Sequence, residues 1–193
     1  MENALAELHN NMNNDDLLEQ VYLEWCEKHA WVFGNFYVMN EVKFRNLTTQ
    51  DTLDISLKNI LTGLQDIIEL KRPNMKVLNY DKDHRNYYFS VEVAKVIGQC
   101  HRYLDKLQEH ALNGFEFNND IIGYHPRALI VIGRSNDWEP VQHRALHGLN
   151  SRLHGITIVT YDQLLSCGSR MLYILKSNYD KNIFDETTID DDC

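Results

Sequence analysis

An apolar run that carries charged residues, Asp66-Ile67-Ile68-Glu69-Leu70-Lys71, lies in the first half of the chain. Its length and its β-branched residues predict a strand. Alternate side chains of a strand share a face, so Glu69 and Lys71 should stand side by side, opposite the apolar residues next to them. Charges on an apolar strand are costly to bury unless they are paired or bind a metal. The run therefore predicts a functional pair, with a plain salt bridge at a strand end as the alternative.

The segments around this strand predict an alternation of helices and strands. Their order indicates an α/β fold in which a central mixed sheet is flanked by helices, with an antiparallel front half and a crossover back half. A polar loop at 74–89 should separate the two halves. The expected helices cover residues 17–29, from near 90 to about 111, 140–153 and 161–176, and the expected strands cover residues 42–44, 53–57, 66–71, 128–133 and 155–160.

Asp54 precedes Glu69 by 15 positions and begins an apolar strand of its own. A short hairpin would bring the two carboxylates together. The segment Glu41-Val42-Lys43 repeats the Glu-x-Lys pattern but has no such acidic partner on an upstream strand. Asp51 and Asp66 remain alternatives for the second carboxylate, because both lie close to the same two strands.

The long helix expected after residue 90 carries a basic stripe. Gln99 and Tyr103 are four residues apart and therefore share one face. Lys95, Arg102 and Lys106 lie on or beside the same stripe, where they could hold phosphate groups. Acidic residues are interspersed, so an ordinary solvated helix face is the alternative.

The bulk composition is that of a globular protein with one core. The chain has 193 residues, of which 44% are hydrophobic and 24% charged. Its net charge of −9 is concentrated at the ends: residues 1–20 hold five acidic residues and no Lys or Arg, and residues 180–193 hold six acidic residues against Lys181. The remainder keeps 18 of the 19 basic and 17 of the 28 acidic residues. Global acidity therefore does not exclude a polyanionic partner.

The two ends of the chain and its cysteines indicate where the protein is located in the cell and how its domain is bounded. No apolar run approaches the ~18 residues of a membrane span, and the N-terminus is unlike a secretory signal. The four cysteines are scattered singly, which predicts free thiols rather than a zinc site or disulfides. We expect a cytoplasmic protein without a membrane contact, with a flexible N-terminus over residues 1–16, one domain over 17–176 and a disordered acidic tail over 177–193.

Two further patterns predict no site. Residues 131–135, Val-Ile-Gly-Arg-Ser, look like the first turn of a nucleotide-binding fold but lack the further glycines of GxGxxG. His143 and His147 are four apart on an expected helix, and without a third ligand they would make a poor zinc site.

In order along the chain, Asp54, Glu69-x-Lys71 and Gln99-x-x-x-Tyr103 resemble the motifs of PD-(D/E)XK nucleases. Other stretches are similar to the catalytic domain of the Shedu anti-phage defence family. The similarity covers roughly residues 17–176. The stretches that carry it are residues 19–34, which end Trp31-Val32-Phe33-Gly34, residues 66–73, which end Glu69-Leu70-Lys71-Arg72-Pro73, and residues 126–133 together with 158–165.

The resemblance implies a restriction-endonuclease-like core and a Mg²⁺-dependent (or Mn²⁺-dependent) DNA endonuclease in anti-phage defence, which forms a homo-oligomer. Such hard cations prefer oxygen ligands. The alternative is a catalytically inactive nucleic-acid-binding or assembly module with the same fold. The implied roles are metal binding for Asp54 and Glu69, positioning or activation of water for Lys71, the first-helix acid for Glu19 with Glu24 as its alternative, and support for Gln99 and Tyr103. The preference of the ion for oxygen adds the carbonyl of Leu70 as a third ligand. The residues expected to contact DNA are Lys95, Arg102, Lys106 and Arg72.

Overall fold

A five-stranded mixed sheet forms the centre of the protein. The computed structural model describes residues 1–34, 37–38, 53–59, 63–114 and 125–186. The strands lie in the order β1-β2-β3-β6-β7; neighbours up to β3 are antiparallel, and β3, β6 and β7 are parallel. The predicted mixed α/β architecture is confirmed, while the strand expected at 42–44 lies outside the described residues. The strands are β1 (Tyr37–Val38), β2 (Ile55–Asn59), β3 (Gln65–Leu70), β6 (Ala128–Val131) and β7 (Ile156–Val159).

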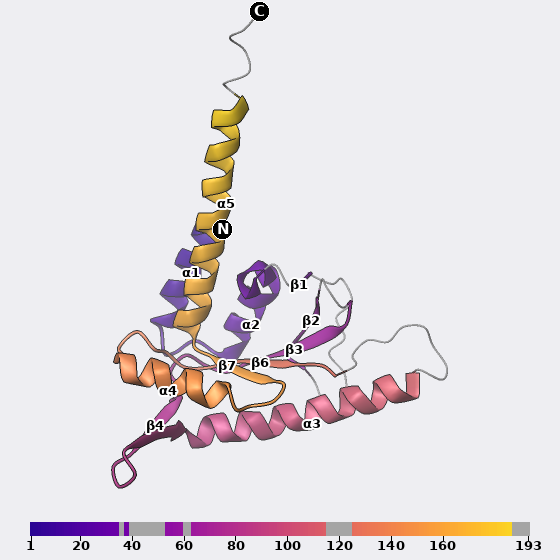
Figure 1. Ribbon diagram of the computed structural model, residues 1–193, viewed down its shortest axis with the longest axis vertical. Helices are drawn as coiled ribbons and strands as arrows, with labels where there is room; N and C mark the ends of the chain where they lie inside the picture. The colour runs from indigo at the N-terminus through magenta and orange to yellow at the C-terminus, as the bar shows by residue number, and fades with distance from the viewer. Residues whose placement is uncertain (35–36, 39–52, 60–62, 115–124, 187–193) are drawn as a thin grey trace, which may run out of the picture.

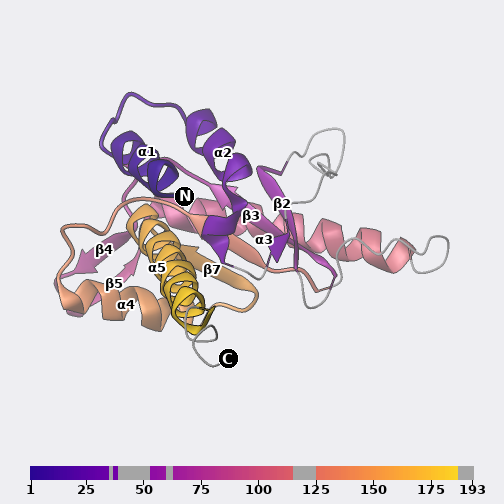
Figure 2. The same cartoon turned by 90° about the horizontal axis from the view of Figure 1, so that it is seen from above.

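Helices cover both faces of the sheet, as Figure 1 shows with α1, α2 and α5 on one side and α3 and α4 on the other. Figure 2 shows α3 crossing beneath the sheet. The side chains of β3 are buried on both faces: Ile68 and Leu70 pack toward α2 and α5, and Ile67 packs toward α3 and α4. The helices are α1 (Glu2–Met12), α2 (Glu19–Lys28), the 3-10 helix η1 (Ala30–Phe33), α3 (Val91–Gly114), α4 (Pro140–Asn150) and α5 (Tyr161–Glu186).

The register of β3 sets the position of the charged residues. Ile55 of β2 lies opposite Ile68, so one step further along the antiparallel pair Asp54 comes opposite Glu69. On the other side of β3, Leu70 pairs with Val131, and the Lys71 amide donates to the Val131 carbonyl at 2.9 Å. Both neighbours therefore hold the end of β3 in place.

Helix α1 occupies residues that the sequence pattern predicted to be a flexible start. Leu8 is fully buried, and the indole Nε1 of Trp25 in α2 donates to the Ala4 carbonyl at 3.1 Å. A Cβ on Gly168 of α5 would come within 2.7 Å of a Leu5 methyl group, so α1 and α5 pack at close range. The expectation of a flexible segment is wrong for residues 2–12, because their apolar face is covered by α2 and α5.

A β-hairpin replaces the polar loop expected at 74–89. It consists of β4 (Leu78–Asp81) and β5 (Asn86–Phe89), which pair antiparallel in a small separate sheet. The Asp81 carboxylate closes the turn by accepting from the amides of Asp83 and His84. Arg85 takes the left-handed backbone conformation, with φ 52°, where glycine or asparagine would have signalled a turn.

The last helix is longer than the sequence predicted, and the last strand is bonded to α4 by a side chain. Helix α5 continues to Glu186, so the first ten residues of the predicted disordered tail are helical. It projects away from the sheet, as Figure 1 shows. The Asn150 side chain at the end of α4 donates to the Ile158 carbonyl and accepts from the Ile158 amide. This pair of bonds fixes α4 against β7.

The remaining expectations concern thiols and membranes. Cys26, Cys100 and Cys167 are free, as predicted, and Cys193 lies outside the described residues. Among the described residues, none of the helices combines the length and the apolar character that a membrane crossing needs.

Replacing Leu8 by Ala tests the docking of α1. We expect a loss of about 3 kcal/mol in the free energy of unfolding, measured by urea denaturation, because a fully buried side chain leaves a cavity. The matched control is Leu18→Ala, whose side chain is 68% exposed and should change stability by less than ~0.5 kcal/mol. Equal effects of the two substitutions would show that α1 is not docked.

Candidate functional site

A buried carboxylate and an ammonium group form the centre of the site. Glu69 is only 2% exposed although it lies in an apolar strand. The Nζ atom of Lys71 donates to Glu69 Oε1 at 2.8 Å, and the Lys71 side chain is itself largely buried. The predicted pair on one face of β3 is therefore present.

Glu19, the first residue of α2, reaches the same ammonium group. Its Oε1 atom accepts from Lys71 Nζ at 3.2 Å. Glu24, the alternative left open by the sequence, is exposed and accepts from Gln20 within α2. Glu19, and not Glu24, is therefore the acid that joins α2 to the end of β3.

Asp54 supplies a second carboxylate beside Glu69. Its Oδ2 atom accepts from the Leu70 amide at 2.8 Å, which holds the carboxylate against β3. Asp66 is directed elsewhere, because its two oxygens accept from the Arg127 amide and from the Tyr37 hydroxyl. Asp51 lies outside the described residues. Of the two described candidates, only Asp54 is held beside Glu69.

The electrostatics of the site follow from burial and from like charges at close range. Burial, together with the Asp54 carboxylate, raises the pKa of Glu69 to about 7, although Lys71 opposes the shift. For Lys71, burial favours the neutral amine, but the charges of Glu69, Glu19 and Asp54 outweigh it and raise the pKa of the ammonium. Lys71 is therefore a fixed cation among three carboxylates.

The donor set is compatible with a hard divalent cation. Two adjacent carboxylates, one of them buried and hard to ionise, are stabilised by any nearby positive charge. Among the described residues, no group of three or more His, Cys, Asp or Glu side chains is arranged to hold a metal ion. A cation at this position would therefore need the Leu70 carbonyl or water in addition to Asp54 and Glu69.

Helix α3 provides the predicted supporting pair. Gln99 Nε2 donates to the hydroxyl of Tyr103 at 2.7 Å, and the Tyr103 ring is buried. Cys100, between them, faces the same part of the core: burial raises the pKa of its thiol to about 12, and the charge of Glu69 adds to the shift. The pKa of Cys100 thus responds to the charge of the Glu69 carboxylate.

The predicted DNA-binding cations lie on one side of α3. At 100° per residue, Lys95, Arg102 and Lys106 fall within about 40° of one another around the helix. Lys95 and Arg102 are exposed, and the Arg102 guanidinium carbon is 5.7 Å from the centre of the Tyr103 ring. Arg72, directly after Lys71, is half-buried.

Tyr161 is a buried residue near the site that the sequence did not single out. It is the first residue of α5 and is fully buried. Burial raises its pKa well above the ordinary value, and the charges of Glu19 and Asp54 contribute. Among the described residues, its hydroxyl has no hydrogen-bond partner. Only its place in a motif shared with the Shedu family could have drawn attention to it.

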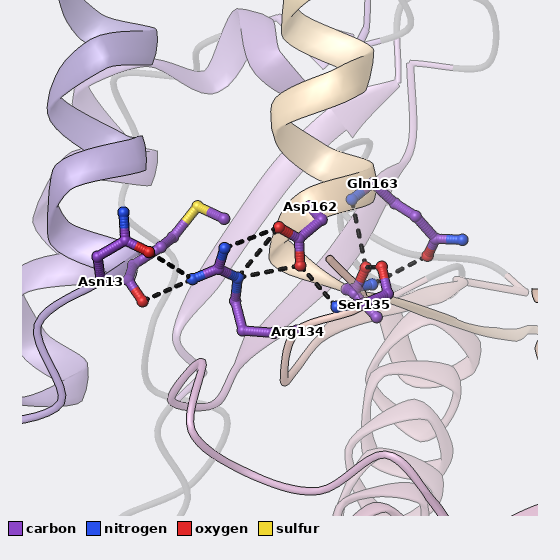
Figure 3. A network of polar contacts seen from close by, with 7 residues as sticks. Asn13, Arg134, Ser135, Asp162 and Gln163 are labelled. Atoms are coloured by element: carbon purple, nitrogen blue, oxygen red, sulfur yellow. Dashed lines mark hydrogen bonds and ion pairs between the residues drawn. The ribbon is translucent and has the colours of Figure 1, made fainter. Parts of the chain in front are cut away.

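An ion pair after β6 joins three distant parts of the chain, as Figure 3 shows. Arg134 Nε contacts both carboxylate oxygens of Asp162, at 3.1 and 3.0 Å, and its Nη1 donates to the Met12 carbonyl at 2.8 Å. The Asp162 carboxylate also accepts from the Ser135 amide at 2.6 Å. The motif residues around Arg134 therefore connect α1, β6 and α5.

Gly133 has a structural role in the same turn. Its φ is +67°, and an added Cβ would lie 2.4 Å from the Met75 carbonyl oxygen. The glycine is thus explained by backbone packing.

The family model described as Shedu protein SduA, C-terminal, matches residues 16–165. The chain belongs to the Shedu family. Membership of the Shedu family points to a role in anti-phage defence. The matched range contains Glu19, Asp54, Glu69 and Lys71 as well as the Arg134–Asp162 pair. No curated protein matches the chain.

Replacing Glu69 by Gln should stabilise the protein at pH 8. The pKa of Glu69 in the folded protein, about 7, lies above the ordinary carboxyl value of 4.5, so ionisation lowers stability progressively from pH 4.5 to 7. We expect a gain on the order of 2 kcal/mol at pH 8 and almost none at pH 5, measured by urea unfolding in EDTA. Glu24→Gln should show no such pH dependence, and a Glu69→Gln protein no more stable than wild type at pH 8 would refute the assignment.

Replacing Asp162 by Asn should destabilise the fold by about 2 kcal/mol, because it leaves the largely buried Arg134 guanidinium without its carboxylate. Chemical denaturation of Asp162→Asn, Arg134→Met and the double variant gives the coupling energy. Asp137→Asn, at an exposed position, is the control. Additive single effects would contradict a direct interaction.

Proposed function

We propose that the chain is a metal-dependent DNA endonuclease that acts in anti-phage defence. The observation that carries the proposal is the contact of Lys71 Nζ with both Glu69 and Glu19, beside Asp54 and at the end of a buried strand. A buried carboxylate beside a second carboxylate destabilises a fold, so the presence of Glu69 next to Asp54 favours a function. The order of these residues and the family membership agree with it.

Asp54, Glu69 and the Leu70 carbonyl would hold Mg²⁺ or Mn²⁺. When bound, such an ion polarises a phosphate and lowers the pKa of a coordinated water. The buried Glu69 carboxylate and Asp54 fix the position of this charge at the end of β3, where β2 and β6 hold the backbone on both sides.

Lys71 would act on the phosphate as a cation. Its ammonium is held by two carboxylates and stays charged, so it stabilises the negative charge that develops on the phosphate oxygens. In hydrolysis a water oxygen bonds to phosphorus and gives up a proton, the bond from phosphorus to a sugar oxygen breaks, and that sugar oxygen takes up a proton. Glu19 would keep Lys71 directed toward the phosphate during this in-line displacement.

The basic stripe of α3 would bind the DNA backbone. Lys95, Arg102 and Lys106 present positive charge beside Gln99, and Arg72 lies next to the site. Contacts to phosphates carry no sequence information, so binding by these residues would be non-specific and would weaken steeply with salt.

The alternative is a module of the same fold that binds nucleic acid or assembles without cutting. The complete set of Asp54, Glu69 and Lys71 favours the enzyme. Homo-oligomer formation, which the family resemblance implies, also remains a proposal, and light scattering of the purified chain would measure it.

The test is cleavage of supercoiled plasmid with Mg²⁺ or Mn²⁺ and with EDTA. Wild type should nick or cut the plasmid only with metal. Glu69→Gln and Lys71→Met should each lower the rate by about 100-fold or more, because each removes charge stabilisation of the transition state.

Glu19→Gln and Glu24→Gln form a matched pair on α2. The first should slow cleavage, and the second should leave it unchanged. Anisotropy of a labelled duplex measures binding in parallel. Cleavage that persists in Glu69→Gln would exclude this site as the catalyst, and tight binding without cleavage in wild type would support the alternative module.

A further inference from the structure

A cavity lies at the end of the sheet where β6 and β7 begin, whereas Lys71 lies beyond the opposite end of β3. Its volume is about 610 Å³, and its lining includes His101 and Asp105 of α3, Arg127 immediately before β6, and His154 shortly before β7. Nothing in the proposed nuclease chemistry uses these residues.

The cavity is separate from the site formed by Glu19, Asp54, Glu69 and Lys71, which we call the acidic site. The cavity lies near the end of β3 where Ile67 pairs with Ala128. Lys71 lies just beyond the other end of β3, where Leu70 pairs with Val131. This separation corresponds to about four residues, or ~13 Å, along β3. On α3, His101 and Asp105 are turned by about 80–120° from Lys95. His101 and Asp105 lie about 60–140° around the helix from Lys95, Arg102 and Lys106, so the cavity borders the basic stripe and does not include its three cations.

Residues with nitrogen donors line this cavity from three segments of the chain. They are His101, His125, Arg127 and His154. His125 is held in a left-handed backbone conformation, with φ 48°, and its amide donates to Gln108 Oε1 at 2.8 Å. Such a conformation is unusual for a residue other than glycine and requires support from its surroundings.

These histidines are not arranged as metal ligands. Across the part of the chain that the structure describes, no three His, Cys, Asp or Glu side chains form a group able to hold an ion. Imidazole N–H groups spread around a cavity instead suit the several oxygens of an anion, and arginine supplies a forked donor that matches a phosphate.

The remaining walls restrict what else the ligand contains. Leu104, Pro126, Leu153 and Ile156 give an apolar surface, and the Asp105 carboxylate is an acceptor. A phosphate ion alone would leave most of about 610 Å³ unfilled, whereas the volume is typical of sites for small organic ligands. The ligand therefore combines an anionic group, an apolar ring and hydroxyl or amino donors.

We propose that this cavity binds a free nucleoside monophosphate. Arg127 and the histidines bind its phosphate, the apolar wall packs on its base, and Asp105 accepts from a hydroxyl or amino group. The inference is independent of the nuclease activity, because no residue of the acidic site takes part.

The test is isothermal titration calorimetry of the full chain with AMP and with UMP in EDTA, which keeps the acidic site free of metal. At least one nucleotide should bind, and Arg127→Gln and His154→Gln should each weaken binding about tenfold or more. All the substituted side chains are exposed, so the fold should be retained, and circular dichroism checks this.

Lys82→Gln, at an exposed position in the turn between β4 and β5, is the control and should leave the affinity unchanged. Inorganic phosphate and adenosine should each bind at least about tenfold more weakly than AMP. The proposal is overturned if neither nucleotide binds at millimolar concentration, or if binding persists unchanged in both Arg127→Gln and His154→Gln.

Discussion

The bond of Lys71 to two carboxylates is the interaction on which the arrangement of the site depends. It links Glu69, buried in the central strand, to Glu19 at the start of α2. Without the ammonium group, the Glu69 carboxylate would lie in an apolar environment beside Asp54, where ionisation is strongly disfavoured. The same cation therefore offsets part of the negative charge of the site and ties a helix to the sheet.

The N-terminal helix extends this linkage through the molecule. Trp25 and Tyr22 of α2 donate to carbonyls of α1, and Arg134 binds the last carbonyl of α1 while it pairs with Asp162 of α5. The position of Glu19 thus depends on contacts made far from Lys71 in the sequence. Part of the motif shared with the Shedu family serves this packing rather than direct chemistry.

Local sequence patterns were sufficient to predict the parts of the structure that depend on residues close together in the sequence. Alternation along β3 predicted the Glu69–Lys71 pair, but only the register of β2 separated Asp54 from Asp66. Helix α1 was missed because its stability comes from burial of Leu8 and its neighbours against distant helices. The β4–β5 hairpin was missed because Arg85 occupies a turn position that glycine or asparagine usually marks.

The bonds between Asn150 and Ile158 have a consequence for association between molecules. In the described sheet, β7 is a terminal strand, and such strands can recruit strands of other chains through their outward amides and carbonyls. The Asn150 amide group satisfies both outward groups of Ile158, as a sixth strand would. One side chain thereby blocks the Ile158 position of this edge against pairing with a strand of another molecule.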